Sequence, residues 1–521
     1  MTTKPNVLFV QSDQLTIDVL SAYNNPIAKT PHIDSIAAKG AVFTDAYCNI
    51  PLCSPSRSSM AAGQLGSRVG AYDNACELPA AVPTYAHYMR LLGYRTCLSG
   101  KMHFVGPDQH HGFERRLTSD IYPGNFEWTP DWNATGFHGA TNTRVLRESG
   151  VCSRTVQLDY DDEVTHRAVQ EIYDCARPEN DRPFFLQVSY THPHDPYLCM
   201  KKHWGLYDDD DIPPPSTPMP TVENNDPHSV RVLSQHGFLN ADVGDDLIQQ
   251  ARRAYCGSVS YIDDQLGHLL HALDESGQRD NTIIIFTSDH GEMLGERGLW
   301  LKKTFFEAAA RVPLIISAPA HLRDGHFSEG RVNTPCSLVD LLPTFANIAC
   351  DGNWGDTPDG DGITGPIEPL DGEDLVQFIT APNPDRTIYA ELLCEGILAP
   401  IFMIRQGRYK LITSTGDPDM LFDLESDPHE RTNLAGDPAY AETLANLKSA
   451  ALEMWDSEAL SIDVVNSQRR RRLVHNAHGN GDAPVWDLVT RPDDETRWYR
   501  GGRNYNDWAL DFLPHPSKRD Q

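Results

Sequence analysis

The sequence is poor in positive charge and contains no long hydrophobic run. It holds 44 lysines and arginines against 73 aspartates and glutamates, a formal net charge of −29 over 521 residues. Nucleic acid or an anionic bilayer would require a positive face, so we expect neither as a partner. A membrane span needs about 18 apolar residues, and the four at 7–10 are too short even for a signal-peptide core. We therefore expect no membrane span and no export, and predict a cytoplasmic protein.

The cysteines also lack a pattern that would mark a structural site. There are eleven, an odd number, scattered along the chain with no Cys-x-x-Cys pair. This distribution is typical of reduced thiols and disfavours both a disulfide framework and a zinc site. The segment 351–372 is rich in glycine and aspartate but lacks the spacing of a calcium loop. We interpret it as a solvated connector.

What the chain does contain is an alternation of short apolar runs and helical patterns. This order is typical of a sheet covered by helices on both faces, so we predict an α/β fold with a three-layer α/β/α core. The continuous apolar runs indicate strands buried on both sides. Strands are expected at 6–10, 94–98, 184–189, 282–287 and 313–317, and helices at 31–40, 84–92 and 246–273.

The last third of the sequence has a different character. A hairpin pattern at 402–412 and a helical pattern at 440–455 predict a second, smaller α+β unit. The remainder, from about Ser457, is polar, rich in tryptophan and arginine, and weakly periodic, so we expect an extended tail that packs on another surface. The predicted domains are 1–375, 376–456 and 457–521.

One cysteine has a context suited to chemistry. Cys53 opens the stretch Cys53-Ser54-Pro55-Ser56-Arg57, and a run of small residues follows. A cysteine at the start of a helix meets the positive end of the helix dipole, and Arg57 would add a second positive charge. A lone cysteine is more often a buried structural residue, so the surrounding pattern carries the hypothesis.

A pair of acidic motifs lies at the ends of two predicted strands. Asp13 follows the first strand, and Asp289-His290-Gly291 follows the strand at 282–287. A single aspartate in such a place is commonly a turn residue, but two at matching strand ends favour a shared cation site. We assign Asp13, Asp289, His290 and the side chain of Cys53 to one divalent metal ion. Oxygen ligands suit Ca²⁺, Mn²⁺ or Mg²⁺, and the imidazole favours Mn²⁺.

Cationic side chains recur after other strands. Lys101 and His103 follow the strand at 94–98, His194 follows the strand at 184–189, and Lys302 lies just beyond the Asp-His pair. Each alone is ordinarily a solvated or hydrogen-bonded group. Because the carboxyl ends of these strands converge on one crevice, we expect the four to surround a tetrahedral anion.

Together these motifs resemble the type I sulfatases of the alkaline phosphatase superfamily, over most of residues 5–455. Cys-x-Pro-x-Arg is the pattern for conversion of cysteine to formylglycine, and here it is Cys53 to Arg57. Most sulfatases carry a second acid where this chain has Gln14, and asparagine where it has His290. The Gln14/His290 variant resembles choline sulfatases and the related phosphonate monoester hydrolases. The resemblance also implies an alkaline-phosphatase-like core with a large mixed sheet.

The resemblance implies a mechanism for hydrolysis of a sulfate monoester. Cys53 becomes formylglycine through a formylglycine-generating enzyme, and its metal-bound diol attacks sulfur. Lys101, Lys302 and Arg57 would hold the sulfuryl oxygens, and His194, with Lys302, would protonate the leaving alcohol. His103 would remove a proton from the second hydroxyl, so that aldehyde and sulfate are released. The cofactors are therefore one divalent metal ion, Ca²⁺ or Mn²⁺ before Mg²⁺, and formylglycine.

Several stretches are similar to choline sulfatases and imply choline-O-sulfate as the substrate. By this resemblance Trp128 would face the trimethylammonium group, with His138 beside it and Asn74 near the sulfate–choline junction. The carboxylate partner is Glu391 or Glu395, and the Glu-Gly context favours Glu395. Around His138 the sequence departs from the family pattern, which weakens the assignment of substrate more than that of reaction.

The tail from Ser467 to Val474 resembles the C-terminal extension of choline sulfatases, which packs against a neighbouring subunit. We therefore expect a homo-oligomer, a dimer or tetramer. Four consecutive arginines, 469–472, occur in this stretch, and in so acidic a chain we favour ion pairing over nucleic-acid binding. The alternatives left open are a phosphonate monoester or phosphodiester hydrolase, an arylsulfatase, and an unmodified anion-binding protein.

Overall fold

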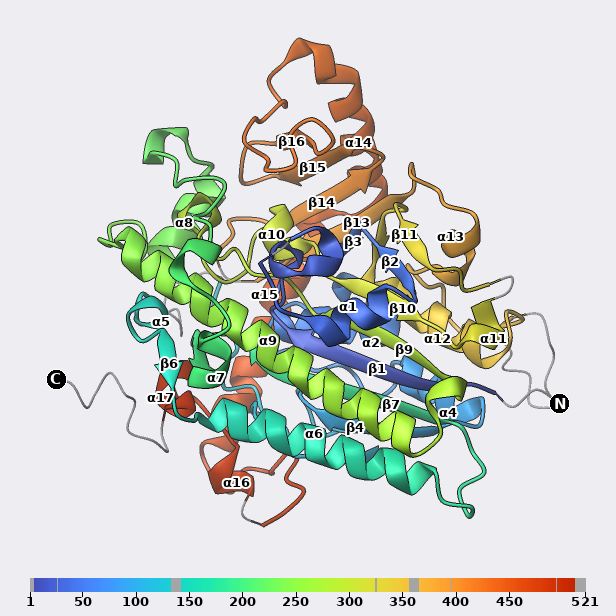
Figure 1. Cartoon of the computed structure of the whole chain (residues 1–521). Helices are drawn as coiled ribbons and strands as arrows, with labels where there is room; N and C mark the ends of the chain where they lie inside the picture. Colours follow the sequence, from blue (N-terminus) through green and yellow to red (C-terminus); the bar gives the residue numbers. More distant parts are fainter. Residues whose placement is uncertain are drawn as a thin grey trace.

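The computed structural model describes residues 4–25, 27–132, 142–323, 326–355, 365–394, 396–492 and 494–510. Its centre is a mixed sheet of eight strands in the order β11-β2-β10-β9-β1-β7-β4-β5 (Figure 1). The strands are β1 (Asn6–Asp13), β2 (Ala41–Phe43), β4 (Arg95–Gly100), β5 (Arg115–Arg116), β7 (Phe184–Pro193), β9 (Thr282–Ser288), β10 (Leu314–Ser317) and β11 (Gly330–Val332). The predicted α/β class and large mixed sheet are confirmed.

The four strands β9, β1, β7 and β4 are neighbours and run parallel. β10 joins β9 in the antiparallel direction, which the apolar run at 313–317 did not reveal. A fully buried strand has the same continuous apolar pattern in either direction, so composition cannot give its orientation. The parallel group matters for function, because the carboxyl ends of its strands meet at one edge.

Helices cover both faces of this sheet and make the three layers. On one face lie α1 (Pro31–Ala37), α6 (Val156–Cys175) and the 31-residue α9 (Asp245–Glu275), and on the other α2 (Cys53–Ala62), α4 (Tyr85–Leu91) and α12 (Leu341–Ala349). Strand β1 shows why both faces are covered, because it is apolar on both sides. Leu8 and Val10 belong to the apolar core on the side of α1, α6 and α9, and Val7 and Phe9 to the core on the other side. Alternate side chains of a strand point to opposite faces, and all four are fully buried.

A second, antiparallel sheet stands beside the first and contains β13 (Thr387–Leu392), β14 (Ile401–Gln406), β15 (Tyr409–Ser414) and β16 (Met420–Asp423). The predicted hairpin is confirmed, because β14 pairs with β15 directly across Gly407 and Arg408. The helix predicted at 440–455 is α14 (Ala441–Met454), which packs Leu447 and Ala451 into the core of this sheet.

The tail differs from the expectation of an extended segment, because it begins with a 22-residue helix, α15 (Ser457–His478). Its buried positions are Leu460, Val464, Gln468 and Arg471, a stripe at helical spacing in which two of the four members are polar. A stripe so poor in apolar residues gives almost no periodic signal in the sequence. Beyond it lie the short helices α16 (Asp494–Arg497) and α17 (Tyr505–Ala509).

The remaining elements are short connections. They are β3 (Ala46–Tyr47), α3 (Gly66–Val69), α5 (Arg144–Arg147), β6 (Gly150–Cys152), β8 (Leu198–Met200), α7 (Lys201–Trp204), α8 (Pro227–Gln235), α10 (Glu307–Ala310), α11 (Ala320–Arg323), β12 (Cys336–Ser337) and α13 (Val376–Thr380). Among the described residues, no helix has the length and apolar content needed to cross a membrane.

Candidate active site

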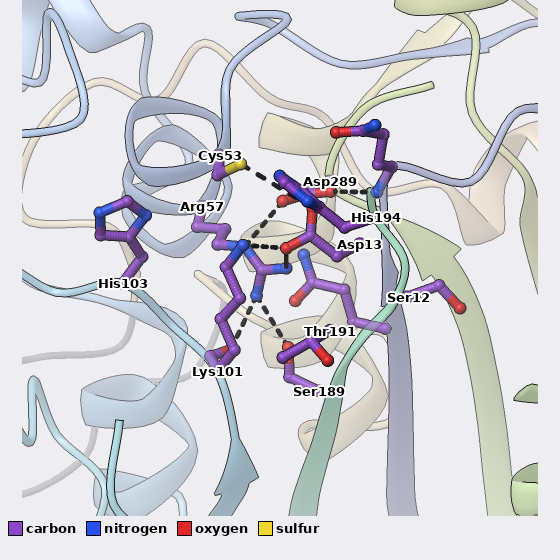
Figure 2. A network of polar contacts seen from close by, with 12 residues as sticks. Ser12, Asp13, Cys53, Arg57, Lys101, His103, Ser189, Thr191, His194 and Asp289 are labelled. Carbon is purple, nitrogen blue, oxygen red and sulfur yellow. Dashed lines mark hydrogen bonds and ion pairs between the residues drawn. The ribbon is translucent and has the colours of Figure 1, made fainter. Parts of the chain in front are cut away.

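The predicted site residues meet at the carboxyl edge of the four parallel strands. Asp13 is the last residue of β1, Lys101 follows β4, His194 follows β7, and Asp289 follows β9. Since these strands lie side by side, their ends bring four residues from distant parts of the sequence into one cluster (Figure 2). All four are buried, and His194 is the most exposed at 6 %.

Cys53 enters the cluster from helix α2, of which it is the first residue. The first-turn N–H groups of a helix have no partner within the helix, so Pro55 is tolerated there and the positive dipole end lies at Cys53. Asn74, predicted to lie near the substrate, accepts a hydrogen bond from the Ser54 N–H through its Oδ1 at 3.0 Å. Asn74 therefore lies beside the residue that follows Cys53, and it fixes the helix start.

The four predicted metal ligands form one compact group. The ligand atoms of Asp13, Cys53, Asp289 and His290 all lie within 4.8 Å of one another. Cys53 Sγ is 3.2 Å from His290 Nε2, and that nitrogen is 3.8 Å from both Asp13 Oδ1 and Asp289 Oδ1. His290 Nδ1 donates to the carbonyl of Gly291 at 3.0 Å, which leaves Nε2 free to bind a cation. This buried set of two carboxylates, an imidazole and a sulfur atom fits a divalent metal ion.

Arg57 holds the two carboxylates in place. Its Nε donates to Asp289 Oδ2 at 2.8 Å, and its Nη2 lies 3.4 Å from Asp13 Oδ2 (Figure 2). Its Nη1 donates to the carbonyl of Lys101 and to Ser189 Oγ, both at 2.7 Å. Four of the five guanidinium N–H groups are used in this way, so Arg57 positions the acids, and its expected contact with a sulfuryl oxygen stays a prediction.

The charges of the cluster shift the acidity of its members. Burial raises the pKa of Asp13, but Lys101, His194 and Arg57 outweigh it and hold this pKa well below its usual range. Burial and Asp13 raise the pKa of the Cys53 thiol, yet Lys101 and Lys302 bring it below its ordinary value. A cysteine with a lowered pKa beside cations marks a place where an anionic oxygen or sulfur is stabilised.

Lys302 and His194 form the second cationic part of the site. Lys302 Nζ lies 2.9 Å from His194 Nε2 and also bonds to the side-chain oxygen of Gln14. His194 Nδ1 donates to the carbonyl of Asp195 at 2.9 Å, so Nε2 is the acceptor for Lys302. The amide nitrogen of Gln14 bonds to Glu292, which fixes the orientation of the amide. Gln14 therefore links Lys302 to a buried acid that the sequence analysis did not single out.

His103 lies to one side of the metal-ligand group (Figure 2). Its ring stacks on that of Tyr122, with 3.8 Å between the ring centroids. Neither ring nitrogen has a hydrogen-bond partner among the described residues. Burial and the nearby charge of Lys101 hold the pKa of His103 well below its ordinary value, so the ring is neutral at neutral pH. The Tyr122 hydroxyl accepts a hydrogen bond from Lys101 Nζ at 3.1 Å and links the two residues.

The expected cation pocket contains a feature that sequence reasoning missed. Trp128 packs edge-on against His103, but the Arg500 guanidinium lies 4.1 Å from the centre of its ring. Tyr505 stacks on His194, with 4.5 Å between the ring centroids. Arg500 and Tyr505 come from the weakly periodic tail, where no motif marked them.

Of the two carboxylates expected near the cationic group of the substrate, Glu391 lies within the described residues. Glu391 is fully buried and accepts hydrogen bonds from the Ser67 N–H at 2.5 Å and the Trp455 indole at 2.7 Å. Both of its oxygens are therefore bonded within the protein, one to α3 and the other to the residue that follows α14. Glu395 and His138 lie outside the described residues.

Comparison with known proteins agrees with this geometry. The family model for sulfatases matches residues 5–351, that for the N-sulphoglucosamine sulphohydrolase C-terminal region matches 295–457, and that for the choline sulfatase C terminus matches 462–511. The chain therefore belongs to the sulfatase family and is a sulfuric ester hydrolase.

Individual relatives give a finer picture. The chain is 40 % identical to the choline-sulfatase of Rhizobium meliloti (strain 1021) over 519 residues, 97 % of each chain. It is 28 % identical to the multifunctional alkaline phosphatase superfamily protein PehA of Trinickia caryophylli, over 88 % of this chain and 96 % of that protein. A phosphonate monoester hydrolase structure from Silicibacter pomeroyi superposes with a TM-score of 0.69 at 25 % identity, covering 86 % of this chain and 95 % of that one.

Proposed function

We propose that the enzyme hydrolyses choline-O-sulfate to choline and sulfate, with a nucleophile derived from Cys53. The observation that carries the reaction is the position of Cys53 at the start of α2, within 4.8 Å of three further metal-ligating side chains. The choice of alcohol rests on the similarity to the Rhizobium meliloti enzyme, which extends through the C-terminal region.

The proposal requires that Cys53 is converted to formylglycine. The recognition pattern is complete from Cys53 to Arg57, but the folded chain leaves Cys53 only 2 % exposed. A formylglycine-generating enzyme would therefore have to modify Cys53 before α2 packs into the core. This enzyme is the one maturation partner that the proposal needs.

A divalent ion, Ca²⁺ or Mn²⁺ before Mg²⁺, would be held by Asp13, Asp289, His290 and the converted Cys53. Its donor set of mostly oxygen with one imidazole is the reason for that order. When bound, the ion would lower the pKa of a coordinated oxygen and so generate a nucleophile at neutral pH. Arg57 would keep the two carboxylates oriented towards it.

The remaining residues take binding and proton-transfer roles. Lys101 and Lys302 supply positive charge for the sulfuryl oxygens, where negative charge accumulates in the transition state. His194 Nε2, which accepts from Lys302 Nζ at 2.9 Å, would take a proton from that ammonium group and pass it to the leaving alcohol, which an alkoxide needs more than a phenoxide does. His103, neutral and with both ring nitrogens free of partners among the described residues, would accept the proton whose loss releases sulfate.

A second candidate, hydrolysis of phosphonate monoesters or phosphate diesters, is favoured by one observation. The chain shares its fold and much of its length with a phosphonate monoester hydrolase. The same nucleophile and metal ligands would serve either reaction, so substrate tests must separate the two.

The experiment is a comparison of substrates on protein whose Cys53 conversion has been verified by peptide mass. We expect the highest kcat/KM with choline-O-sulfate, lower values with an aryl sulfate and a matched phosphate diester, and none of these activities in Cys53→Ala. A preference for the phosphate diester would replace the proposed substrate while keeping the site. Equal turnover by Cys53→Ala would contradict the nucleophile.

A further inference from the structure

Arg500 is a buried cation that the reaction described above does not use. It lies between α16 and α17 and is 5 % exposed. Its backbone N–H donates to the carbonyl of Ile121 at 3.0 Å, which fixes this part of the tail against the segment that carries Tyr122. The backbone at Arg500 is therefore fixed next to the segment that carries Tyr122.

The guanidinium of Arg500 is surrounded by aromatic rings. Its central carbon is 4.1 Å from the ring centre of Trp128, 5.1 Å from that of Tyr505 and 5.5 Å from that of Tyr122. Among the described residues no ion pair with a carboxylate is formed, although the buried Asp195 acts on Arg500 electrostatically, and the Nε of Arg500 has no hydrogen-bond partner. Ring faces attract a cation, but they offer no acceptor along the N–H directions of the planar fork.

A buried and unpaired guanidinium is costly unless an anion meets it. Removing a charge from water costs several kcal/mol by effective estimates, and only a paired, hydrogen-bonded partner offsets most of that cost. Burial lowers the pKa of Arg500, although its ordinary value is so high that the group stays charged at neutral pH. Asp195 offsets part of this cost through its charge but forms no ion pair with Arg500 among the described residues, so the guanidinium remains able to bind an anionic ligand.

The surroundings of Arg500 indicate where that anion would lie. Tyr122, one of its three rings, stacks on His103 and accepts a hydrogen bond from Lys101. The charge of Arg500 also lowers the pKa of His103, and Arg500 interacts electrostatically with Tyr122, Tyr505 and Asp195, and less strongly with Cys53. Arg500 therefore faces the same centre as Lys101, from the side of the aromatic rings.

We propose that Arg500 binds a sulfuryl oxygen of the substrate, as a third cation beside Lys101 and Lys302 that the C-terminal segment adds to the site. The inference rests on the proposed sulfate ester hydrolysis.

The test measures binding of inorganic sulfate to the metal-loaded, formylglycine-containing enzyme by calorimetry. Arg500→Met should weaken sulfate binding by about 10- to 100-fold, as expected for lost hydrogen bonds from a charged group, and Arg500→Lys should restore part of it. Arg497→Met, which removes an exposed arginine of the same segment, is the matched control and should bind sulfate as the wild type does.

Kinetics on two esters then identify which part of the substrate Arg500 contacts. Arg500→Met should lower kcat/KM for choline-O-sulfate and for uncharged n-butyl sulfate by the same factor, with an unchanged melting temperature in Arg500→Lys as a check on folding. Unchanged sulfate binding, or an effect confined to the choline ester, would overturn the proposal. A wild type that neither binds sulfate nor hydrolyses either ester would contradict the proposed function itself.

Discussion

At the scale of single residues, the site is built from side chains that are far apart in the sequence and close together in space. Asp13 and Asp289 are 276 positions apart, yet Arg57 bonds to both. Parallel strands explain this, because consecutive strand ends meet at one edge whatever the length of the connections. That rule is why Asp13, Lys101, His194 and Asp289 could be predicted as one cluster.

Arg500 could not be predicted in the same way. Its position depends on how an irregular segment crosses the aromatic side chains of residues 122 and 128, and no periodicity encodes that path. The positioning role of Arg57 was not predicted either, because only the coordinates show that it bonds to both Asp289 and Asp13, while its contact with a sulfuryl oxygen stays a prediction. Sequence motifs thus indicated which residues lie together in the site, and the contacts showed which of their polar groups are already hydrogen-bonded within the protein.

The first residue-scale prediction concerns the metal ligands. His290→Ala removes the imidazole whose Nε2 lies 3.2 Å from Cys53 Sγ, so Mn²⁺ binding should weaken by at least about 10-fold. Calorimetric titration of Mn²⁺ into metal-free protein measures this directly. The control His271→Ala alters an exposed histidine of α9 and should leave binding unchanged. Equal Mn²⁺ affinity in wild type and His290→Ala would remove His290 from the ligand set.

A second prediction at this scale concerns Glu391. Burial raises the pKa of Glu391 to about 7, whereas an unfolded glutamate titrates near ~4.3. Between these values the folded protein binds more protons, so the free energy of unfolding falls as pH rises through this window and stays low above it. Relative to Glu391→Gln, the wild type should lose about 1–3 kcal/mol between pH 4.5 and pH 8.

The measurement is thermal unfolding of both proteins across that pH range. Fluorescence suits it, because the Trp455 indole donates to Glu391 and reports the same contact. A wild-type melting temperature that runs parallel to that of Glu391→Gln over the whole range would show that Glu391 does not titrate in this window. Little change in KM is expected in the variant, because both carboxylate oxygens are already bonded.

At the scale of elements, strands and amphipathic helices were predictable where burial imposes a period. β1, β7 and β9 appeared as continuous apolar runs, and α4 begins directly after its N-cap residue Thr84 as the pattern indicated. Helix α15 was not predicted, because polar side chains fill half of its buried stripe. It forms ion pairs through Arg471 and Arg472, a kind of contact that the arginines at 469–472 had suggested without indicating the partners.

The prediction at this scale tests how α15 is held. Arg471 forms two hydrogen bonds with Asp73, at 2.8 and 2.7 Å, and both side chains are buried. Arg471→Met would leave the Asp73 carboxylate buried without its cation and should destabilise the fold by about 3 kcal/mol. Arg470→Met removes an exposed arginine from the same helix and should change stability by less than about 0.5 kcal/mol.

Denaturant midpoints of the two variants give the comparison. Combining Arg471→Met with Asp73→Asn should recover part of the loss, because the uncompensated charge is then gone. Equal midpoints for Arg471→Met and Arg470→Met would show that this ion pair does not anchor the helix.

At the scale of the whole molecule, the expected assembly is still a prediction. The helices α14 and α15 carry large apolar side chains at exposed positions, since Leu452 is 78 % exposed, Leu473 70 % and Ile462 55 %. We predict that the chain forms a homodimer or homotetramer and that α14 and α15 take part in the contact. The limits of the three domains, at 375 and 456, also stay predictions.

Sedimentation equilibrium tests the oligomer. Leu473→Glu should shift the mass towards the monomer by placing a charge in the contact, while Leu91→Glu, at an equally exposed leucine of α4, should not. A wild-type chain that sediments as a monomer at micromolar concentration would contradict the expected assembly.

The central claim is that sulfate ester hydrolysis depends on converted Cys53. The most direct measurement plots the rate of sulfate release from choline-O-sulfate against the converted fraction of Cys53, in preparations of different conversion quantified by peptide mass. The account predicts a straight line through the origin, because only the converted residue carries the nucleophile. A rate that is independent of the converted fraction would contradict it.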